Sequence, residues 1–172
     1  MSKGALADTL VTDESGETVS KELYPGKYLL REISAPEGYI LNAEPREITV
    51  VSGIVSAEIF NERKKQEYKI QKNLEKDQKF GIGLNGEILN IRFGLFSKTE
   101  LTALDGSIIP AGGLIEIASP DEDGSLSFAA DMPYDAECYI KELETDEHYL
   151  LSDKQYLNGD TAENKIIRGS IE

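Results

Sequence analysis

The stretch TDESGETVSKELYPGKYLLREISAPEGYIL, from Thr12 to Leu41, decides the fold, because the chain contains a second version of it. That copy, PDEDGSLSFAADMPYDAECYIKELETDEHYLL, runs from Pro120 to Leu151. Each copy has an acidic turn with Gly, a polar strand, a turn with Pro, and an apolar strand that ends in Arg-Glu or Lys-Glu. A segment repeated at this spacing predicts a tandem array of β-domains and not a single catalytic fold.

Short runs with alternating or apolar patterns follow one another along the chain and predict β-strands. The expected strands are Lys27–Ile33, Arg46–Val51, Ile54–Phe60, Tyr68–Leu74, Ile88–Phe96, Leu114–Ile117, Ser125–Phe128, Cys138–Leu143 and Lys165–Ile171. Turns with Asn-Gly, Asp-Gly or Pro-Gly separate them. One stretch, Gln71–Lys79, is also compatible with a short helix. The pattern as a whole predicts an all-β chain of tandem immunoglobulin-like β-sandwich domains.

The composition argues against several classes of function. The formal net charge of −14 argues against nucleic-acid binding, which needs clustered Lys and Arg. No apolar run is long enough to span a bilayer, so we expect no membrane contact. With one Cys and one His, a disulfide framework, a Cys-based zinc site and a Ser-His-Asp site are not expected. The sequence therefore predicts no metal, no cofactor and no enzyme activity.

A charged stretch, Glu62–Gln66, marks the expected boundary between two units. The first would comprise residues 1–62 and the second residues 66–172. The second has much sequence before its copy of the repeated segment, whereas the first has almost none. We therefore expect the first unit to be partial and to lack its first strands.

Strand alternation directs one Glu of each copy toward the core. Glu32 shares a face with Leu30, and Glu142 shares a face with Ile140, while the basic residue between them in each strand must face solvent. A buried carboxylate is costly unless it is protonated or hydrogen-bonded. The ordinary alternative for either Glu is a position at a sheet edge.

Three further polar residues fall on apolar faces. Lys72 shares a face with Ile70, Asn61 shares one with Ile59, and Asn164 shares one with Ala162 and Ile166. An inward Lys on a first strand, an inward Glu in mid-domain and an inward Asn on a last strand form a specific set. The ordinary alternatives are a Lys that reaches solvent along its own stem and an Asn in a turn.

The pattern TDESG…L-x-P-G-K-Y-x-L-x-E-x-x-A-P-E-G-Y-x-L resembles the collagen-adhesin B-type repeat, a prealbumin-like β-sandwich of Gram-positive surface proteins and pili. The first unit matches over Leu10–Asn61. The second matches through FGLF, DGSIIPAGGL, DEDG, MPYD and YIKELETDEHYLL, at Phe93–Phe96, Asp105–Leu114, Asp121–Gly124, Met132–Asp135 and Tyr139–Leu151. The resemblance covers nearly the whole chain.

The resemblance implies a spontaneous isopeptide bond between a first-strand Lys and a last-strand Asn, assisted by a buried Glu. By position these residues are Lys72, Glu142 and Asn164 in the second unit. In the first unit, Glu32 and Asn61 form an incomplete site without a Lys, because no upstream strand supplies one and Lys3 lies too close to the acidic turn. One spacing departs from the pattern, because the second unit is shorter after its Glu and shows no clear counterpart of the strand at Arg46–Val51.

The resemblance also implies a function. It predicts structural stalk or spacer repeats of an extracellular, cell-wall-attached adhesin or pilin, with neighbouring repeats as partners and a host extracellular-matrix or surface ligand bound through other domains. The alternatives are a β-sandwich that itself binds a carbohydrate or host matrix protein and a pilus subunit polymerised by a sortase. The absence of Trp weakens a sugar-stacking site, and Tyr139 is the best residual candidate for one.

Overall fold

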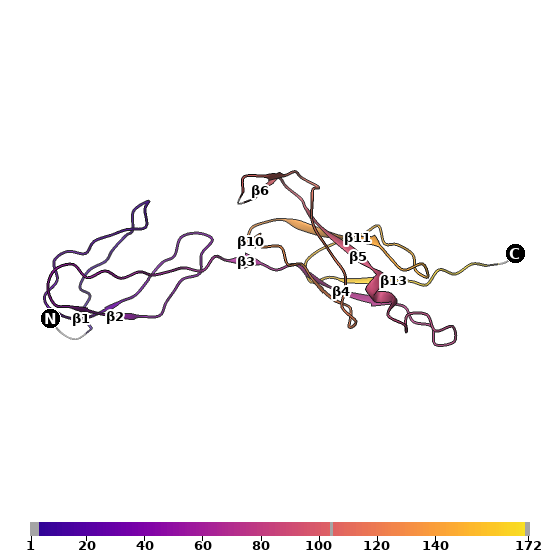
Figure 1. Ribbon diagram of the computed structural model, residues 1–172, viewed down its shortest axis with the longest axis horizontal. Coiled ribbons are helices and arrows are strands. Elements are labelled where there is room, and N and C mark those ends of the chain that lie inside the picture. Colours follow the sequence, from indigo (N-terminus) through magenta and orange to yellow (C-terminus); the bar gives the residue numbers. More distant parts are fainter. Residues whose placement is uncertain (1–3, 104, 171–172) are drawn as a thin grey trace. The chain divides into compact units, whose positions relative to one another are not determined.

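The computed structural model describes residues 4–103 and 105–170, so Lys3 lies outside the described residues. Over these residues the chain is all-β apart from one short 3-10 helix. It separates into two compact units, unit 1 (Met1–Arg63) and unit 2 (Lys64–Glu172) (Figure 1).

Unit 2 is a sandwich of two sheets. One sheet has the strand order β12-β11-β5-β8 and is antiparallel throughout, and the other has the order β13-β4-β9. In the second sheet β4 is antiparallel to β9 and parallel to β13. These strands are β4 (Lys69–Leu74), β5 (Arg92–Ser97), β8 (Leu114–Ala118), β9 (Ser125–Ser127), β11 (Cys138–Glu144), β12 (Gln155–Tyr156) and β13 (Thr161–Asn164).

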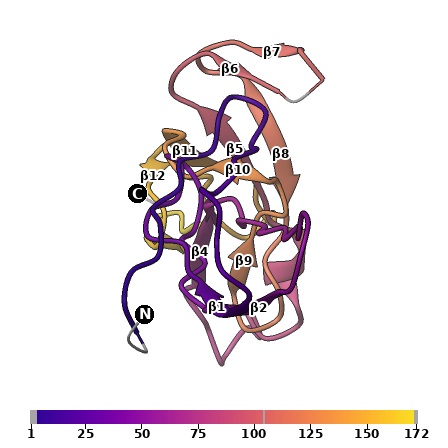
Figure 2. The ribbon, with the colours of Figure 1, turned by 90° about the vertical axis from the view of Figure 1, so that its left-hand side faces the viewer.

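The remaining elements of unit 2 lie at its margins. A short pair joins β3 (Lys65–Gln66) to β10 (Met132–Pro133), and a hairpin joins β6 (Leu101–Thr102) to β7 (Ile108–Ile109). The hairpin projects from one end of the sandwich (Figure 2). The 3-10 helix η1 (Glu87–Asn90) precedes β5.

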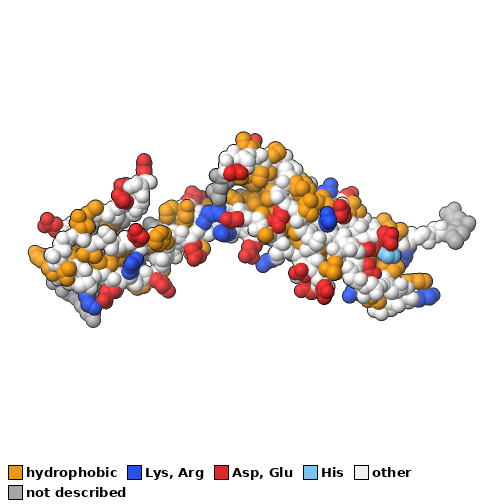
Figure 3. All heavy atoms as spheres, viewed as in Figure 1, with side chains coloured by type: hydrophobic (Ala, Val, Ile, Leu, Met, Phe, Trp, Pro, Cys, Tyr) orange, Lys and Arg blue, Asp and Glu red, His pale blue; other side chains and the backbone are white. Residues whose placement is uncertain are grey.

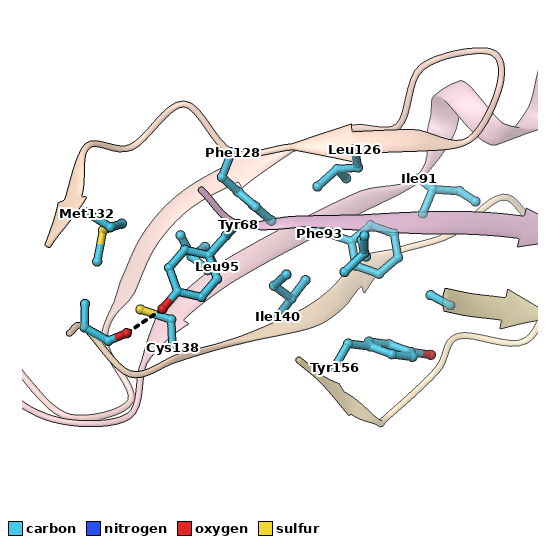
Figure 4. Close-up of a cluster of buried hydrophobic side chains, with 13 residues drawn as sticks. Tyr68, Ile91, Phe93, Leu95, Leu126, Phe128, Met132, Cys138, Ile140 and Tyr156 are labelled. Carbon is cyan, nitrogen blue, oxygen red and sulfur yellow. Dashed lines mark hydrogen bonds between the residues drawn. The ribbon is translucent and has the colours of Figure 1, made fainter. Parts of the chain in front are cut away.

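The core of unit 2 lies between the two sheets (Figure 4). Phe93 and Leu95 of β5 and Ile140 of β11 have no exposed surface, and they belong to one buried cluster with Ile70 of β4 and Leu126 of β9. The strands β4 and β11 alternate buried and more exposed positions, as half-buried strands should, whereas β5 buries three consecutive residues, Phe93, Gly94 and Leu95. The sandwich thus forms because each sheet has one apolar face to cover.

Unit 1 contains one strand pair, β1 (Gly26–Leu30) with β2 (Arg46–Val50). No other strand occurs in its described residues. Apolar side chains are correspondingly exposed, among them Ile54 at 97% and Val19 at 90%. The surface view shows apolar and acidic side chains side by side on this unit (Figure 3). Residues 4–63 of unit 1 thus form no second layer like the one that covers the core of unit 2.

The structure corrects four local expectations. Residues 54–60 form no strand, and Gln71–Lys79 is not helical because its first half belongs to β4. The stretch Ile88–Phe96 starts as η1, which follows Gly86 at a φ of 82°, so β5 begins only at Arg92. The last strand ends at Asn164, where Lys165–Ile171 was expected, and only one isolated bridge, Tyr149 to Ile166, continues it.

We expect Leu95→Ala to destabilise unit 2 by about 2–5 kcal/mol, because it removes a fully buried side chain from the centre of the core. Urea unfolding followed by tyrosine fluorescence measures this change. The matched control is Ile108→Ala in the β6–β7 hairpin, where the side chain is 62% exposed and the loss should stay within about 0.5 kcal/mol. Equal losses in the two variants would contradict the assignment of the core.

Candidate functional site

Three polar side chains meet inside unit 2. They are Lys72 of β4, Glu142 of β11 and Asn164 of β13, which are 1%, 1% and 2% exposed. The Lys72 Nζ atom donates to Glu142 Oε1 at 2.9 Å and to Asn164 Oδ1. The Asn164 Nδ2 atom donates to Glu142 Oε1 at 3.1 Å and to Oε2 at 3.0 Å. The inward orientation expected for Lys72 and Glu142 is confirmed, and the three side chains form one hydrogen-bonded cluster.

The segment after β11 completes this cluster. The Asn164 Nδ2 atom also donates to the Leu150 carbonyl at 2.9 Å and to Thr145 Oγ1 at 3.1 Å. The Ser152 backbone N–H donates to Glu142 Oε2 at 2.7 Å. These contacts fix the rotamers of the amide and the carboxylate. Sequence reasoning missed all three partners.

The surroundings of Lys72 favour the neutral amine. Burial lowers the pKa of Lys72, and the hydrogen bond and charge of Glu142 oppose this effect only in part. The Nζ atom lies 5.5 Å from the centre of the Phe93 ring, at the apolar side of the cluster. A neutral amine in contact with a carboxamide and a carboxyl group has the components for nucleophilic attack with general acid-base assistance.

The backbone of β4 is held where Lys72 lies. The Lys72 N–H donates to the Gly124 carbonyl at 2.7 Å, in the acidic turn before β9. Gly124 has a φ of 83°, and a Cβ atom there would collide with the Lys72 carbonyl oxygen. Glycine at this position therefore serves both the left-handed turn and the close approach of β4.

Glu75, which follows β4, binds the two residues Ile166 and Arg168 that lie just after Asn164. Its carboxylate accepts a hydrogen bond from the Ile166 N–H at 2.9 Å and two from the Arg168 guanidinium at 3.0 and 2.9 Å. The Arg168 hydrogen bond, followed by that of Ile166, lowers the pKa of Glu75 to about 2. The end of β4 and the exit from β13 are thus tied together next to the cluster.

Unit 1 contains the same arrangement without the lysine. The Asn61 Nδ2 atom donates to Glu32 Oε1 at 2.8 Å, to Glu32 Oε2 at 2.7 Å and to the Ile40 carbonyl at 3.0 Å. The Asn42 N–H donates to Glu32 Oε2 at 2.7 Å. These partners lie eight and ten residues after Glu32, as Leu150 and Ser152 lie after Glu142. That shared spacing is the signal by which the missed partners could have been found.

The described lysines of unit 1 are engaged elsewhere. Lys27 pairs with Glu47 at 2.8 Å, and Lys21 lies 4.0 Å from Asp8. Both side chains are largely exposed. Within residues 4–63, therefore, no lysine completes the Glu32–Asn61 pair.

Asn164 reaches Glu142 although the two residues are closer in the sequence than Glu32 and Asn61 are in unit 1. Glu142 and Asn164 are 22 residues apart and Glu32 and Asn61 are 29, yet both pairs are hydrogen-bonded. The expectation that Arg46–Val51 lacks a counterpart was wrong, because β12 pairs with β11 as β2 pairs with β1. The counterpart is only two residues long, so alternation could not reveal it.

Other candidates contribute no reactive site. Cys138 is buried, and burial raises the pKa of its thiol. Tyr139 faces outward and stacks on Phe96, with ring centroids 5.3 Å apart and an interplanar angle of 11°. Among the described residues no cluster of three His, Cys, Asp or Glu could hold a metal ion, and no helix could cross a membrane.

Comparison with known proteins identifies the fold of unit 1. Residues 2–63 match the family model of the SpaA prealbumin-like fold domain. The prealbumin-like fold expected from the repeated segment is therefore confirmed. The matched family is a structural domain family and not a class of enzymes.

The chain is also similar to one surface protein in sequence and to two solved structures. The trypsin-resistant surface T6 protein of Streptococcus pyogenes serotype M6 is 32% identical over 78 residues, which are 45% of this chain and 14% of that protein. The Bacillus anthracis TIE protein has 22% identity and a TM-score of 0.55, over 92% of this chain and 28% of that one, which supports the fold alone. A streptococcal ancillary pilin gives a TM-score of 0.37 at 16% identity, over 84% and 43% of the two chains. The chain thus spans less than a third of the first two proteins.

We expect Gly124→Ala to destabilise unit 2 more than Gly159→Ala does. Both glycines have positive φ, which costs a non-glycine residue about 1–3 kcal/mol, but only Gly124 also abuts the β4 backbone. Urea unfolding of each variant gives the comparison. If the two losses were equal, the close approach of β4 to this turn would be refuted.

The hydrogen bonds of the Glu75 carboxylate with Ile166 and Arg168 predict that the stability of unit 2 depends on pH. Because the folded-state pKa of Glu75 is about 2 and its ordinary value is 4.5, its contribution is fully present above 4.5 and is lost as the pH falls towards 2. The difference in urea midpoint between the parent and Glu75→Gln should therefore shrink over this interval. A difference that is constant from pH 7 to pH 2 would contradict the role of an ionised Glu75 carboxylate in these contacts.

Proposed function

We propose that the chain is part of a structural stalk or spacer of a Gram-positive cell-surface adhesin or pilin, and that a Lys72–Asn164 isopeptide bond closes unit 2. The observation that carries this proposal is the buried contact of Lys72 Nζ with Glu142 and Asn164. An ordinary structural role would not require an amine, a carboxyl and a carboxamide to share one dry site.

The reaction follows from the contacts. The neutral Nζ atom of Lys72 attacks Cγ of Asn164, and Glu142, which contacts both groups, polarises the amide and transfers a proton from Nζ to Nδ2. The Cγ–Nδ2 bond breaks and ammonia leaves, so a new amide joins the two side chains. The folded sandwich supplies the proximity, and the reaction occurs once per chain without turnover.

The position of the bond suits a load-bearing element. The strands that it would join, β4 and β13, are parallel neighbours. The chain enters unit 2 just before β4 and leaves just after β13, so tension pulls the two strands in opposite directions along their length. A covalent link between them would bear this tension, so the chain between Lys72 and Asn164, which are 92 positions apart, would not be extended.

A cell-surface location is part of the proposal. The match to a streptococcal surface protein supports it, as does the prealbumin-like match over unit 1. Neighbouring repeats or subunits are then the immediate partners, and a host ligand would be bound by other domains of the parent protein. The acidic side chains are spread over the visible face and not gathered in one patch, in accord with a solvated spacer (Figure 3).

The second candidate function is direct binding of a carbohydrate or matrix protein. The half-buried stack of Tyr139 on Phe96 at the outer face of the β12-β11-β5-β8 sheet is the observation in its favour. A glycan array tests it, and Tyr139→Ala should abolish any signal that depends on this stack.

The intact mass under denaturing conditions tests the isopeptide bond. We expect the parent chain to be lighter than its sequence mass by one ammonia, because the reaction expels Nδ2 of Asn164. Glu142→Ala should have its full sequence mass, and so should Lys72→Met and Asn164→Ala. Tryptic peptides of the parent should include one that joins Lys72 to Asn164.

Glu144→Ala is the matched control, since Glu144 ends the same strand but is exposed. It should retain the loss of ammonia. A parent chain at full sequence mass would overturn the isopeptide proposal. A loss that persists in Glu142→Ala would remove Glu142 from the mechanism.

Mechanical extension tests the spacer role. Under force, Glu142→Ala should release roughly 300 Å of chain from unit 2, from 92 residues at about 3.3–3.6 Å each, whereas the cross-linked parent should not release it. By the loop-closure relation, a cross-link of this span also stabilises the folded state by about 4–5 kcal/mol, to be measured by urea unfolding. Equal extension of the two proteins would contradict the load-bearing role.

A further inference from the structure

The strand β11 contains a β-bulge directly after Glu142. Glu142 lies opposite Phe93 in β5, but the preceding residue of β5, Arg92, lies opposite Glu144, so β11 has one extra residue at this point. An extra residue reverses which of the following side chains point inward. Thr145, which regular alternation from Glu142 would turn to solvent, is therefore half-buried, and Glu144 is exposed. The bulge thus turns Thr145 toward the interior of unit 2.

Thr145 is one of three neighbours of the Asn164 side-chain nitrogen. The Nδ2 atom contacts Thr145 Oγ1 at 3.1 Å, the Leu150 carbonyl at 2.9 Å and the two Glu142 oxygens at 3.1 and 3.0 Å. A carboxamide nitrogen carries only two hydrogens. The three neighbours therefore exceed what an unreacted Asn164 side chain can satisfy.

Unit 1 shows that a Glu–Asn pair forms without this hydroxyl. Thr145 lies three residues after Glu142, and the residue three positions after Glu32 is Ala35. In the described part of unit 1, Asn61 Nδ2 has two neighbours, the Glu32 carboxylate and a backbone carbonyl. Two neighbours match the two hydrogens of an unreacted amide. The third neighbour of Asn164 is thus not needed to hold the amide against the carboxylate.

The bonding of Asn164 Nδ2 changes in the reaction proposed for unit 2. In the amide, the lone pair of this nitrogen is delocalised into the carbonyl group, so the group is planar. When Lys72 Nζ attacks Cγ, the carbon becomes tetrahedral and the lone pair localises on Nδ2. The nitrogen is then pyramidal, with two hydrogens and one lone pair, and it must gain a proton before it leaves as ammonia. Three neighbours match this species better than they match the amide.

We propose that Thr145 is a further catalytic residue of the reaction between Lys72 and Asn164, in which its hydroxyl binds the leaving nitrogen in the tetrahedral intermediate. Thr145 Oγ1 and the Leu150 carbonyl accept the two N–H groups, so that the lone pair of Nδ2 points at Glu142. This proposal rests on the reaction proposed for unit 2. It adds a residue that the sequence alone did not indicate.

The proton transfers balance without a co-reactant. Glu142 takes a proton from Lys72 Nζ and gives it to the lone pair of Asn164 Nδ2. The Cγ–Nδ2 bond then breaks, ammonia leaves and one amide forms. Thr145 keeps its own hydrogen throughout, and nothing is oxidised or reduced.

This role concerns the rate of the reaction more than the stability of the fold. A group that binds the intermediate better than the starting amide lowers the barrier between them. Loss of the Thr145 hydroxyl should therefore slow the reaction and leave the unreacted fold in place. The bulge in β11 is then a feature that serves the chemistry, because it turns a hydroxyl to the leaving nitrogen.

The test measures how fast the full chain loses ammonia. The chain is made by cell-free synthesis, translation is stopped after a short pulse, and samples are quenched in acid and urea at successive times. Intact mass gives the fraction of chain that is lighter by one ammonia. The Lys72→Met chain, which cannot form the bond, gives the background.

Three substitutions separate the hydroxyl from the shape of the side chain. Thr145→Val keeps the branched shape without the hydroxyl and should slow the loss of ammonia by roughly tenfold, the factor expected for one hydrogen bond made in the intermediate. Thr145→Ser keeps the hydroxyl and should retain most of the parent rate. Thr161→Val removes an exposed hydroxyl from β13, the strand of Asn164, and should leave the rate unchanged.

A structural role is tested in a background that cannot react. In the Lys72→Met chain, Thr145→Val should leave unit 2 folded, with a urea midpoint close to that of Lys72→Met alone. If Thr145→Val unfolded this chain in the absence of urea, a structural role would account for any slow reaction and the proposal would be overturned.

The remaining outcomes distinguish this proposal from the function proposed for unit 2. A Thr145→Val chain that reacts at the parent rate overturns the role of Thr145 and leaves the isopeptide bond intact. A Thr145→Ser chain that is as slow as Thr145→Val also overturns it, because the hydroxyl would then not be the feature that matters. A parent chain that loses no ammonia overturns both proposals.

Discussion

The burial of one lysine constrains the architecture of unit 2. A lysine amine without hydrogen-bond partners in an apolar core is costly, so Lys72 is tolerated there only because Glu142 and Asn164 bind it. These residues come from three strands in two sheets, and the cluster therefore specifies how the sheets face each other. The apolar core supplies the driving force, and the polar cluster selects one register.

The same cluster connects the topology to the proposed role. Parallel pairing of the first and last long strands requires the chain to traverse the whole sandwich before it returns beside β4. Backbone hydrogen bonds alone would hold this pair weakly under load, because β13 is only four residues long and few bonds share the tension. A bond between side chains of β4 and β13 would remove that weakness without a disulfide, and the chain's one cysteine is buried in the core.

Unit 1 shows which features of the site form without the lysine and which do not. The Glu32–Asn61 pair persists without a lysine because the carboxylate accepts the amide N–H groups and a backbone N–H, which satisfies it at partial burial. Its apolar inner face cannot be satisfied in this way. Ile59 and Leu30 are therefore left partly exposed in the described part of unit 1.

The sequence by itself determined the all-β class, the repeated segment and the faces on which Lys72 and Glu142 lie. These follow from alternation along single strands, which is a local property. Only the tertiary structure decided that Asn164 meets the other two residues, that a two-residue strand pairs with β11, and that residues 54–60 form no strand. A strand exists only where a partner takes its backbone hydrogen bonds, and that partner lies far away in the sequence.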